Sequence, residues 1–383
     1  MSIYLDYNAS APIAPAVLQV MVDVYQNRSG NADSRTHSYG DEARAVVETA
    51  RKQVASLLGI SPSEVFFTSG ATESSNIAIQ GLAEYAHRSG KCHIITSSIE
   101  HKAVLETVRM MERQGFDVDF VAPEPSGRVD AAKIVDKLRD TTLLVSLMHV
   151  NNETGIIQPV EELGAELAAR DVLFHVDATQ SCGKLVDELR TLAYHMLSFS
   201  AHKLRGPQGI GILVLRKKGY RRPPVKAIMY GGQQEHGLRP GTIPVALAAG
   251  CGAACALAEV HYAEDAVRLK EMKERAMELL DASELSYAVN GDPAHCLPNT
   301  LNVCLHGVSS EALMIATKQY CAVSNGSACT STDYTPSYVL AAMGLSAERI
   351  ASSIRISWGA DTDRERFSEE FAKLLTVARE FAQ

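Results

Sequence analysis

The alternation of short apolar runs with longer helical patterns between residues 41 and 215 constrains the fold of this chain most. Residues 41–59 repeat apolar side chains at helical spacing and end at Gly59, a residue typical of helix C-termini. Residues 64–70 then predict a strand, and residues 71–90 predict a helix. Near-continuous apolar strands separated by helices indicate a mostly parallel sheet that helices cover on both faces.

The same strand pattern continues along the chain and then changes. Further strands are expected within residues 93–101, 143–155, 172–180 and 195–216. Beyond about residue 255 the pattern includes a charged helical stretch, a short apolar strand and a final amphipathic helix, at 264–282, 300–305 and 363–382. The sequence therefore predicts a large α/β domain followed by a smaller α+β domain.

Composition narrows the functional classes. Lys plus Arg total 37 and Asp plus Glu total 45, which gives a net charge of −8 and disfavours broad, sequence-blind nucleic-acid binding. A chain of 383 residues buries a large core without disulfides. The N-terminus lacks the basic and apolar regions of a signal peptide, and no apolar run approaches the ~20 residues that span a bilayer. We expect a cytoplasmic protein with reduced thiols and no membrane contact.

Polar residues of unusual type follow two neighbouring predicted strands. One strand ends at Asp177 and the next is followed by Lys203, 26 residues later. Functional groups in sheets of this kind gather at the carboxyl ends of the strands. Gly70 and Thr72 stand where a strand leads into a helix, and the N-terminus of a helix favours an anion such as phosphate.

A lysine, a carboxylate and a phosphate cradle together fit pyridoxal phosphate. The lysine would form a Schiff base with it, the carboxylate would pair with the pyridine nitrogen and the helix N-terminus would hold the phosphate. Each feature alone has an ordinary structural explanation, such as a solvated loop or a helix N-cap. Their occurrence together, in compatible order, favours the cofactor.

Eight motifs resemble, in order, those of the NifS/IscS-type cysteine desulfurases, which are pyridoxal-phosphate enzymes of the class V aminotransferase family. They are TSGATESSN (68–76), EHKAV (100–104), MHVNNETG (148–155), HVDATQSCGK (175–184), SFSAHKLRGPQGIG (198–211), RPGTIPV (239–245), SNGSACTS (324–331) and SSIRIS (352–357). The resemblance implies the PLP-dependent transferase fold (aminotransferase fold type I). It implies a large domain over 15–255 with a mostly parallel seven-stranded sheet, and a small domain formed by 1–14 and 256–383.

The resemblance also implies roles for individual residues. Lys203 matches the Schiff-base lysine, Cys329 the catalytic cysteine, and His101 a histidine that stacks on the cofactor ring and transfers protons. Arg355 matches the arginine that binds the substrate carboxylate, a task suited to its bidentate geometry. The positions expected to contact the cofactor are Ala71, Thr72, Asn152, Asp177, Gln180, Ser200, His202, Lys203 and Thr242, with Asn152 also reaching the substrate.

The implied reaction converts L-cysteine to L-alanine. Lys203 and His101 move protons, and the Cys329 thiolate attacks the substrate sulfur and becomes a persulfide, which passes to an acceptor protein. Thr242 matches a threonine that reaches the phosphate of the neighbouring subunit, so the resemblance implies a homodimer with shared active sites.

Three features depart from the commoner family pattern. Pro240 stands where Ser is usual, and Asn325 stands where many relatives have Ser. The sequence ends at Gln383 without the C-terminal extension that housekeeping members use to grip an iron–sulfur scaffold. The acceptor therefore stays open among an iron–sulfur scaffold, a tRNA-thiolation protein and a DNA-phosphorothioation component, with no direct nucleic-acid binding expected.

Two other kinds of function compete with this reading. One is a selenocysteine lyase or an aminotransferase of the same fold, and the other is a non-catalytic subunit of a sulfur-transfer complex. The remaining seven cysteines are interpreted as packing residues, and no metal site is expected because ligands with suitable spacing are lacking around them.

Overall fold

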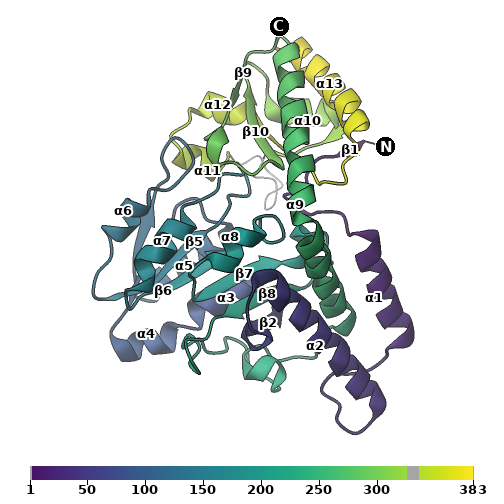
Figure 1. The fold of residues 1–383 in the computed structure, drawn as a ribbon. Coiled ribbons are helices and arrows are strands. Elements are labelled where there is room, and N and C mark those ends of the chain that lie inside the picture. The colour runs from purple at the N-terminus through teal and green to yellow at the C-terminus, as the bar shows by residue number, and fades with distance from the viewer. Residues whose placement is uncertain (1, 326–335, 383) are drawn as a thin grey trace.

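The computed structural model describes residues 2–325 and 336–382. Cys329, the expected catalytic cysteine, lies outside the described residues. Figure 1 shows a large α/β body with a smaller layer of helices and strands above it, joined along one side by the long helix α9 (Val245–Ala282).

The large body is built on a seven-stranded sheet, as the family resemblance implies. Its strand order is β2-β8-β7-β6-β5-β3-β4. The pairs from β7 to β4 are parallel, whereas β8 pairs antiparallel with both β7 and β2. The strands are β2 (Val65–Thr68), β3 (His93–Ser97), β4 (Asp117–Val121), β5 (Thr142–Met148), β6 (Leu173–Asp177), β7 (Met196–Ser200) and β8 (Gly211–Leu215).

Helices cover both faces of this sheet. Ile94 and Ile95, successive residues of β3, belong to two different apolar clusters because side chains of a strand alternate between faces. One cluster includes residues of α3 and α5, and the other includes residues of α2, α7, α8 and α9. The helices of this body are α1 (Pro15–Asn27), α2 (Ser38–Leu58), α3 (Ala71–Gln80), α4 (Ala83–Ser89), α5 (Lys102–Arg113), α6 (Ala131–Val135), α7 (Val160–Ala168) and α8 (Val186–Thr191).

Two glycines mark helix ends, one at a position that the sequence predicted and one at a position that it did not. Gly59 ends α2 in the left-handed conformation with φ of 65°, as expected of a C-cap. The single helix expected over 71–90 is wrong, because the chain forms α3 and α4 with a break at Gly81. A Cβ atom at Gly81 would lie 2.6 Å from the carbonyl oxygen of Lys226, whose N–H donates to the Gly81 carbonyl at 2.8 Å. A segment distant in sequence therefore packs against the break.

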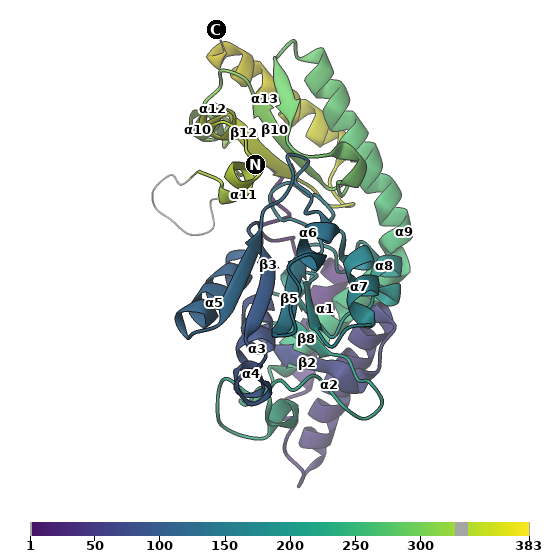
Figure 2. The ribbon, with the colours of Figure 1, turned by 90° about the vertical axis from the view of Figure 1, so that its left-hand side faces the viewer.

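The smaller layer contains two short sheets. β12 (Ser353–Ser357), β10 (Thr300–Leu305) and β9 (Tyr287–Val289) pair antiparallel, and β1 (Ile3–Tyr4) pairs parallel with β11 (Cys321–Ala322). Trp358, Phe367 and Phe371 are buried in its own apolar core. Its helices are α10 (Ser310–Thr317), α11 (Tyr338–Ala342), α12 (Ala347–Ala351) and α13 (Arg364–Phe381). Figure 2 shows this layer above the large sheet.

In the described part of the chain, α9 is the one helix that is long and apolar enough to cross a membrane, and 44% of its most apolar window is buried. Its first half packs against α2 so closely that a Cβ at Gly252 would lie 2.5 Å from Ala50 Cα. Cys251 and Cys255 are fully buried in the same region. This half of α9 is therefore a core helix.

Candidate active site

Asp177 and Lys203 lie at the carboxyl ends of two adjacent strands of the large sheet. β6 ends at Asp177, and β7 leads directly into a 3₁₀ turn that carries Lys203. Asp177 is 5% exposed, and its Oδ1 accepts a hydrogen bond from the backbone N–H of Thr179 at 2.9 Å and another from the Thr179 hydroxyl. The strand-end positions expected from the sequence are thus neighbours in the fold.

The Lys203 ammonium is held by the N-terminal segment. Its Nζ donates to the carbonyl oxygens of Asn8 at 2.5 Å and Ala9 at 2.7 Å. The adjacent His202 contacts Ser10 Oγ through Nδ1 at 3.1 Å. Burial, helped by the charge of Lys203, lowers the pKa of His202 to about 4. His202 is therefore a neutral hydrogen-bonding group at physiological pH.

The start of α3 forms an open anion site. Gly70 is its N-cap and supplies no side-chain cap, so N–H groups of the first turn, which includes Thr72, are available to an anion. Ala71 N donates to Ser200 Oγ at 2.7 Å, which brings the end of β7 to the same place. A Cβ at Gly211 would lie 2.5 Å from Gly70 Cα, so this close approach needs glycine.

His101 is the N-cap of α5, and its Nδ1 accepts a hydrogen bond from Ala103 N at 3.1 Å. Nδ1 then carries no proton, so a neutral ring carries its proton on Nε2. Burial lowers the pKa of His101; the charges of Lys203 and Lys102 act in the same direction, and Asp177 acts against them. The helix N-terminus also disfavours the imidazolium ion. A neutral His101 ring therefore presents Nε2–H as a hydrogen-bond donor.

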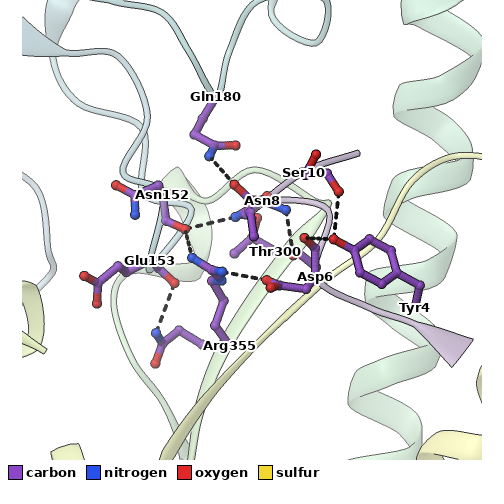
Figure 3. Close-up of polar contacts among 12 residues, drawn as sticks. Tyr4, Asp6, Asn8, Ser10, Asn152, Glu153, Gln180, Thr300 and Arg355 are labelled. Atoms are coloured by element: carbon purple, nitrogen blue, oxygen red, sulfur yellow. Dashed lines mark hydrogen bonds and ion pairs between the residues drawn. The ribbon is translucent and has the colours of Figure 1, made fainter. Parts of the chain in front are cut away.

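Asn8 is the centre of the hydrogen-bond network in Figure 3, and sequence reasoning gave it no role. Its carbonyl oxygen accepts from Gln180 Nε2 at 3.0 Å as well as from Lys203. Its side-chain amide donates to Asn152 O at 3.2 Å and to Thr300 Oγ1 at 2.9 Å. Because Thr300 begins β10 of the smaller layer, the N-terminal segment joins both parts of the protein at the site.

Arg355 lies on β12 and is 1% exposed. Its Nη2 pairs with Asp6 Oδ1 at 2.6 Å, and its Nη1 donates to Asn152 O at 3.0 Å (Figure 3). Each of these nitrogens carries a second N–H, so the guanidinium can bind a further carboxylate while these two contacts fix its plane. Asp6 was not expected from the sequence, because only the fold brings it to Arg355.

Asn152 follows β5, and its side-chain Oδ1 is buried without a hydrogen-bond partner among the described residues. A buried acceptor left unpaired costs free energy, so a donor group on a ligand would stabilise it. Gln180, by contrast, uses its amide nitrogen on Asn8. Asn152 Oδ1 is thus a candidate for a direct contact with a bound molecule.

Glu100 is a fully buried carboxyl group beside the site that sequence reasoning missed. Its Oε1 accepts from Ser97 Oγ at 2.7 Å and from Met148 N at 2.9 Å, while Oε2 has no partner in the described part of the chain. Burial raises the pKa of Glu100 to about 8; the two hydrogen bonds oppose this shift, and the negative charge of Asp177 adds to it. Glu100 is therefore mostly protonated at neutral pH.

Thr242 is not joined to this cluster. It is exposed just before α9, and no hydrogen bond among the described residues links it to Lys203 or Asp177. The role expected of Cys329 falls on a residue outside the described ranges.

The residues present fit pyridoxal phosphate. The chemistry of the cofactor calls for an amine to hold its aldehyde carbon, a carboxylate for its pyridine nitrogen and N–H or hydroxyl donors for its phosphate. Lys203, buried Asp177 and the uncapped start of α3 beside Ser200 supply this set at one sheet edge. The unpaired Asn152 Oδ1 offers an acceptor beside them.

Comparisons with a family model and with individual known proteins agree on one family for this chain. The model for class-V aminotransferases matches residues 3–368. The cysteine desulfurase IscS of Escherichia coli is 46% identical over 367 residues, which cover 95% of this chain and 90% of IscS.

Solved structures agree with this match. A NifS-like protein superimposes with a TM-score of 0.91 at 34% identity, covering 99% of this chain and all of that one. DndA from Streptomyces lividans superimposes with a TM-score of 0.81 at 43% identity, covering 92% of this chain and 98% of DndA.

Proposed function

The chain belongs to the class-V aminotransferase family and is a pyridoxal-phosphate-dependent cysteine desulfurase, and we propose that its own residues divide the work as follows. The observation that carries the proposal is the meeting of Lys203, Asp177 and the open start of α3 at one sheet edge. The similarity to IscS favours this reading over a selenocysteine lyase, an aminotransferase or a non-catalytic subunit.

Pyridoxal phosphate, when bound, withdraws electrons from the α-carbon of the amino acid joined to it and so makes its bonds easier to break. Lys203 would hold the aldehyde carbon and Asp177 would pair with the ring nitrogen. The phosphate would be held by Ala71, Thr72, Ser200 and His202. The Lys203 amine, once released from this bond, is the base that takes the α-proton of L-cysteine, because it is an amine at the site and His101 is a donor.

His101 would assist the proton transfers of Lys203 in this scheme as a hydrogen-bond donor. Its Nδ1 accepts from the N–H of Ala103, so a neutral ring donates a hydrogen bond through Nε2–H, and Lys203 carries the transferred proton. The lowered pKa of His101 keeps the neutral form dominant. It therefore orients and donates to the substrate and does not add a positive charge beside Lys203.

Arg355 and Asn152 would hold the substrate. The guanidinium of Arg355 is oriented by Asp6, and its remaining N–H groups would take the carboxylate of L-cysteine. The Cys329 thiolate then attacks the substrate sulfur. The carbon–sulfur bond breaks and its electron pair stays with the β-carbon, which takes a proton, while a sulfur–sulfur bond forms. The products are a persulfide on Cys329 and L-alanine.

The persulfide sulfur would pass to an acceptor protein, and the enzyme would work in the cytoplasm, where free cysteine and reduced thiols are available. Because the chain is similar to both IscS and DndA, we propose as acceptor a protein of a sulfur-transfer pathway and name no single pathway. We further propose a homodimer in which Thr242 reaches the phosphate of the second subunit. The exposure of Thr242 supports this role.

Replacing the proposed nucleophile tests the function. Cys329→Ala should lose sulfide production from L-cysteine in the presence of a thiol reductant, while its cofactor absorbance still changes when L-cysteine is added. Sulfide production at the wild-type rate would show that no protein thiol takes the sulfur, as in a lyase.

A further inference from the structure

Glu73 places a carboxylate in the first turn of α3, the turn proposed to hold the cofactor phosphate. Its Oε2 accepts from the backbone N–H of Ser69 at 2.5 Å, so the carboxylate turns back toward the start of the helix. Burial raises the pKa of Glu73, but the hydrogen bond from Ser69 and the pairing with Arg239 outweigh burial, so the pKa lies below its usual value. The side chain is therefore ionised at neutral pH.

This negative charge conflicts with the binding of an anion. The N-terminus of a helix attracts an anion through its free N–H groups and its dipole. A carboxylate in the same turn repels a phosphate, because charges of like sign that lie close together away from bulk water interact strongly. A phosphate site at the start of α3 therefore needs a positive charge that balances Glu73.

Arg239 supplies that charge. Its Nε donates to Glu73 Oε1 at 3.0 Å and its Nη2 donates to Glu73 Oε2 at 3.4 Å, so the guanidinium binds both carboxylate oxygens. Both side chains are mostly buried, with 20% of Arg239 and 12% of Glu73 exposed. Water and salt screen such a pair less than they screen a pair on the surface. The pairing therefore offsets the charge of Glu73 beside the start of α3.

The segment before Arg239 is fixed to the large sheet. Glu235 Oε2 accepts from Phe67 N on β2 at 2.8 Å, and Arg51 of α2 binds both oxygens of Glu235, through Nη1 at 2.9 Å and Nη2 at 2.7 Å. Glu235 and Arg51 are both buried. β2 is also the strand that leads into the turn before α3. The same strand therefore supports both partners of the pair between Arg239 and Glu73.

We propose that Arg239 is a positioning residue that keeps the start of α3 able to bind the cofactor phosphate by neutralising Glu73. Arg239 does not touch the phosphate and acts through the charge of Glu73. This inference rests on the proposed function, because it requires the phosphate to lie at the start of α3. The phosphate group, and not the rest of the cofactor, should therefore be sensitive to the pair.

Arg239→Met leaves Glu73 unpaired and tests the proposal, and Arg190→Met is its matched control. Arg190 makes an ion pair of the same kind with Glu259 at 2.6 Å, between α8 and α9. Each protein is stripped of cofactor and titrated, by absorbance, with pyridoxal phosphate and with pyridoxal, which lacks the phosphate. Comparison of the two dissociation constants measures what the phosphate contributes to binding.

We expect Arg239→Met to bind pyridoxal phosphate roughly tenfold or more weakly than wild type, because the charge of Glu73 then repels the phosphate. Its affinity for pyridoxal should stay at the wild-type value. Arg190→Met should match wild type with both compounds. If Arg239→Met binds pyridoxal phosphate as tightly as wild type, or loses affinity for both compounds equally, the inference is overturned.

Substitution of Glu73 separates charge from structure. Glu73→Gln alone leaves the positive charge of Arg239 in place, so it should bind pyridoxal phosphate at least as tightly as wild type. Glu73→Gln combined with Arg239→Met removes both charges and should restore the preference of wild type for pyridoxal phosphate over pyridoxal. A double variant that binds pyridoxal phosphate as weakly as Arg239→Met, or a Glu73→Gln variant that binds it more weakly than wild type, would overturn the inference. A wild-type protein that binds the two compounds equally would instead contradict the phosphate site of the proposed function.

Discussion

Replacing Glu100 by Gln should remove a pH-dependent loss of stability. The carboxyl group is fully buried, and its hydrogen-bond donors among the described residues, Ser97 and Met148 N, are neutral. Burial raises its pKa from 4.5 to about 8. In the unfolded chain the same group loses its proton near pH 4.5. Between these two values the unfolded state binds fewer protons than the folded state, so stability falls as pH rises.

The interval between the two pKa values gives the size of the effect. The difference of 8 − 4.5 corresponds to at most about 5 kcal/mol, lost progressively between pH 4.5 and pH 8. A glutamine at this position keeps the shape, accepts from Ser97 and Met148 through its oxygen, and does not ionise. Glu100→Gln should therefore match wild type within about 1 kcal/mol at pH 5 and be more stable by a few kcal/mol at pH 8.

Urea unfolding of the holoenzyme at both pH values, followed by far-UV circular dichroism at one fixed cofactor concentration, measures this difference. Glu112→Gln, an exposed carboxyl on α5, is the control and should show the same small difference at both pH values. If the gap between Glu100→Gln and wild type is also the same at pH 5 and pH 8, Glu100 does not hold its proton and the reasoning is refuted.

Three further substitutions test the assigned roles. Asp177→Asn should lower the rate of alanine formation at least ~100-fold, because a neutral amide does not hold a proton on the pyridine nitrogen. A near-wild-type rate would show that Asp177 does not pair with that nitrogen. Arg355→Lys should raise KM for L-cysteine roughly tenfold or more, with less effect on kcat, because lysine lacks the planar guanidinium that binds a carboxylate through two N–H groups. An unchanged KM would show that the substrate carboxylate binds elsewhere. Thr242→Ala should speed loss of cofactor on dialysis without changing the circular dichroism spectrum, and equal retention would contradict the shared phosphate site.

Most of the large sheet was predictable because its central strands are short, almost continuous apolar runs between helical patterns. The edge strand β4 was not predicted, because most of its residues are not buried and its pattern is weaker. The alternation of apolar runs with helical patterns after residue 41 predicted a sheet covered by helices. Gly59 marked the end of α2 because glycine readily adopts the left-handed backbone conformation. The close contact of Gly81 with the backbone of Lys226 was not predictable, since only the fold brings these two residues together.

The same distinction between local patterns and contacts made only in the fold applies at the site. Lys203 and Asp177 were found because strand ends of a parallel sheet meet at one edge. Asp6 pairs with Arg355, 349 positions away, so no local pattern points to it. Glu100 stands in a recognisable motif, but its protonation follows from complete burial, and burial is a property of the packed structure.

The central claim is that Cys329 takes sulfur from L-cysteine. The most direct measurement is mass spectrometry of the holoenzyme after a short exposure to L-cysteine without reductant, with L-alanine measured in the same sample. The proposed chemistry predicts one added sulfur atom on the peptide that contains Cys329 and an equal amount of L-alanine. L-Alanine formed together with free sulfide, with no sulfur added to that peptide, would contradict it.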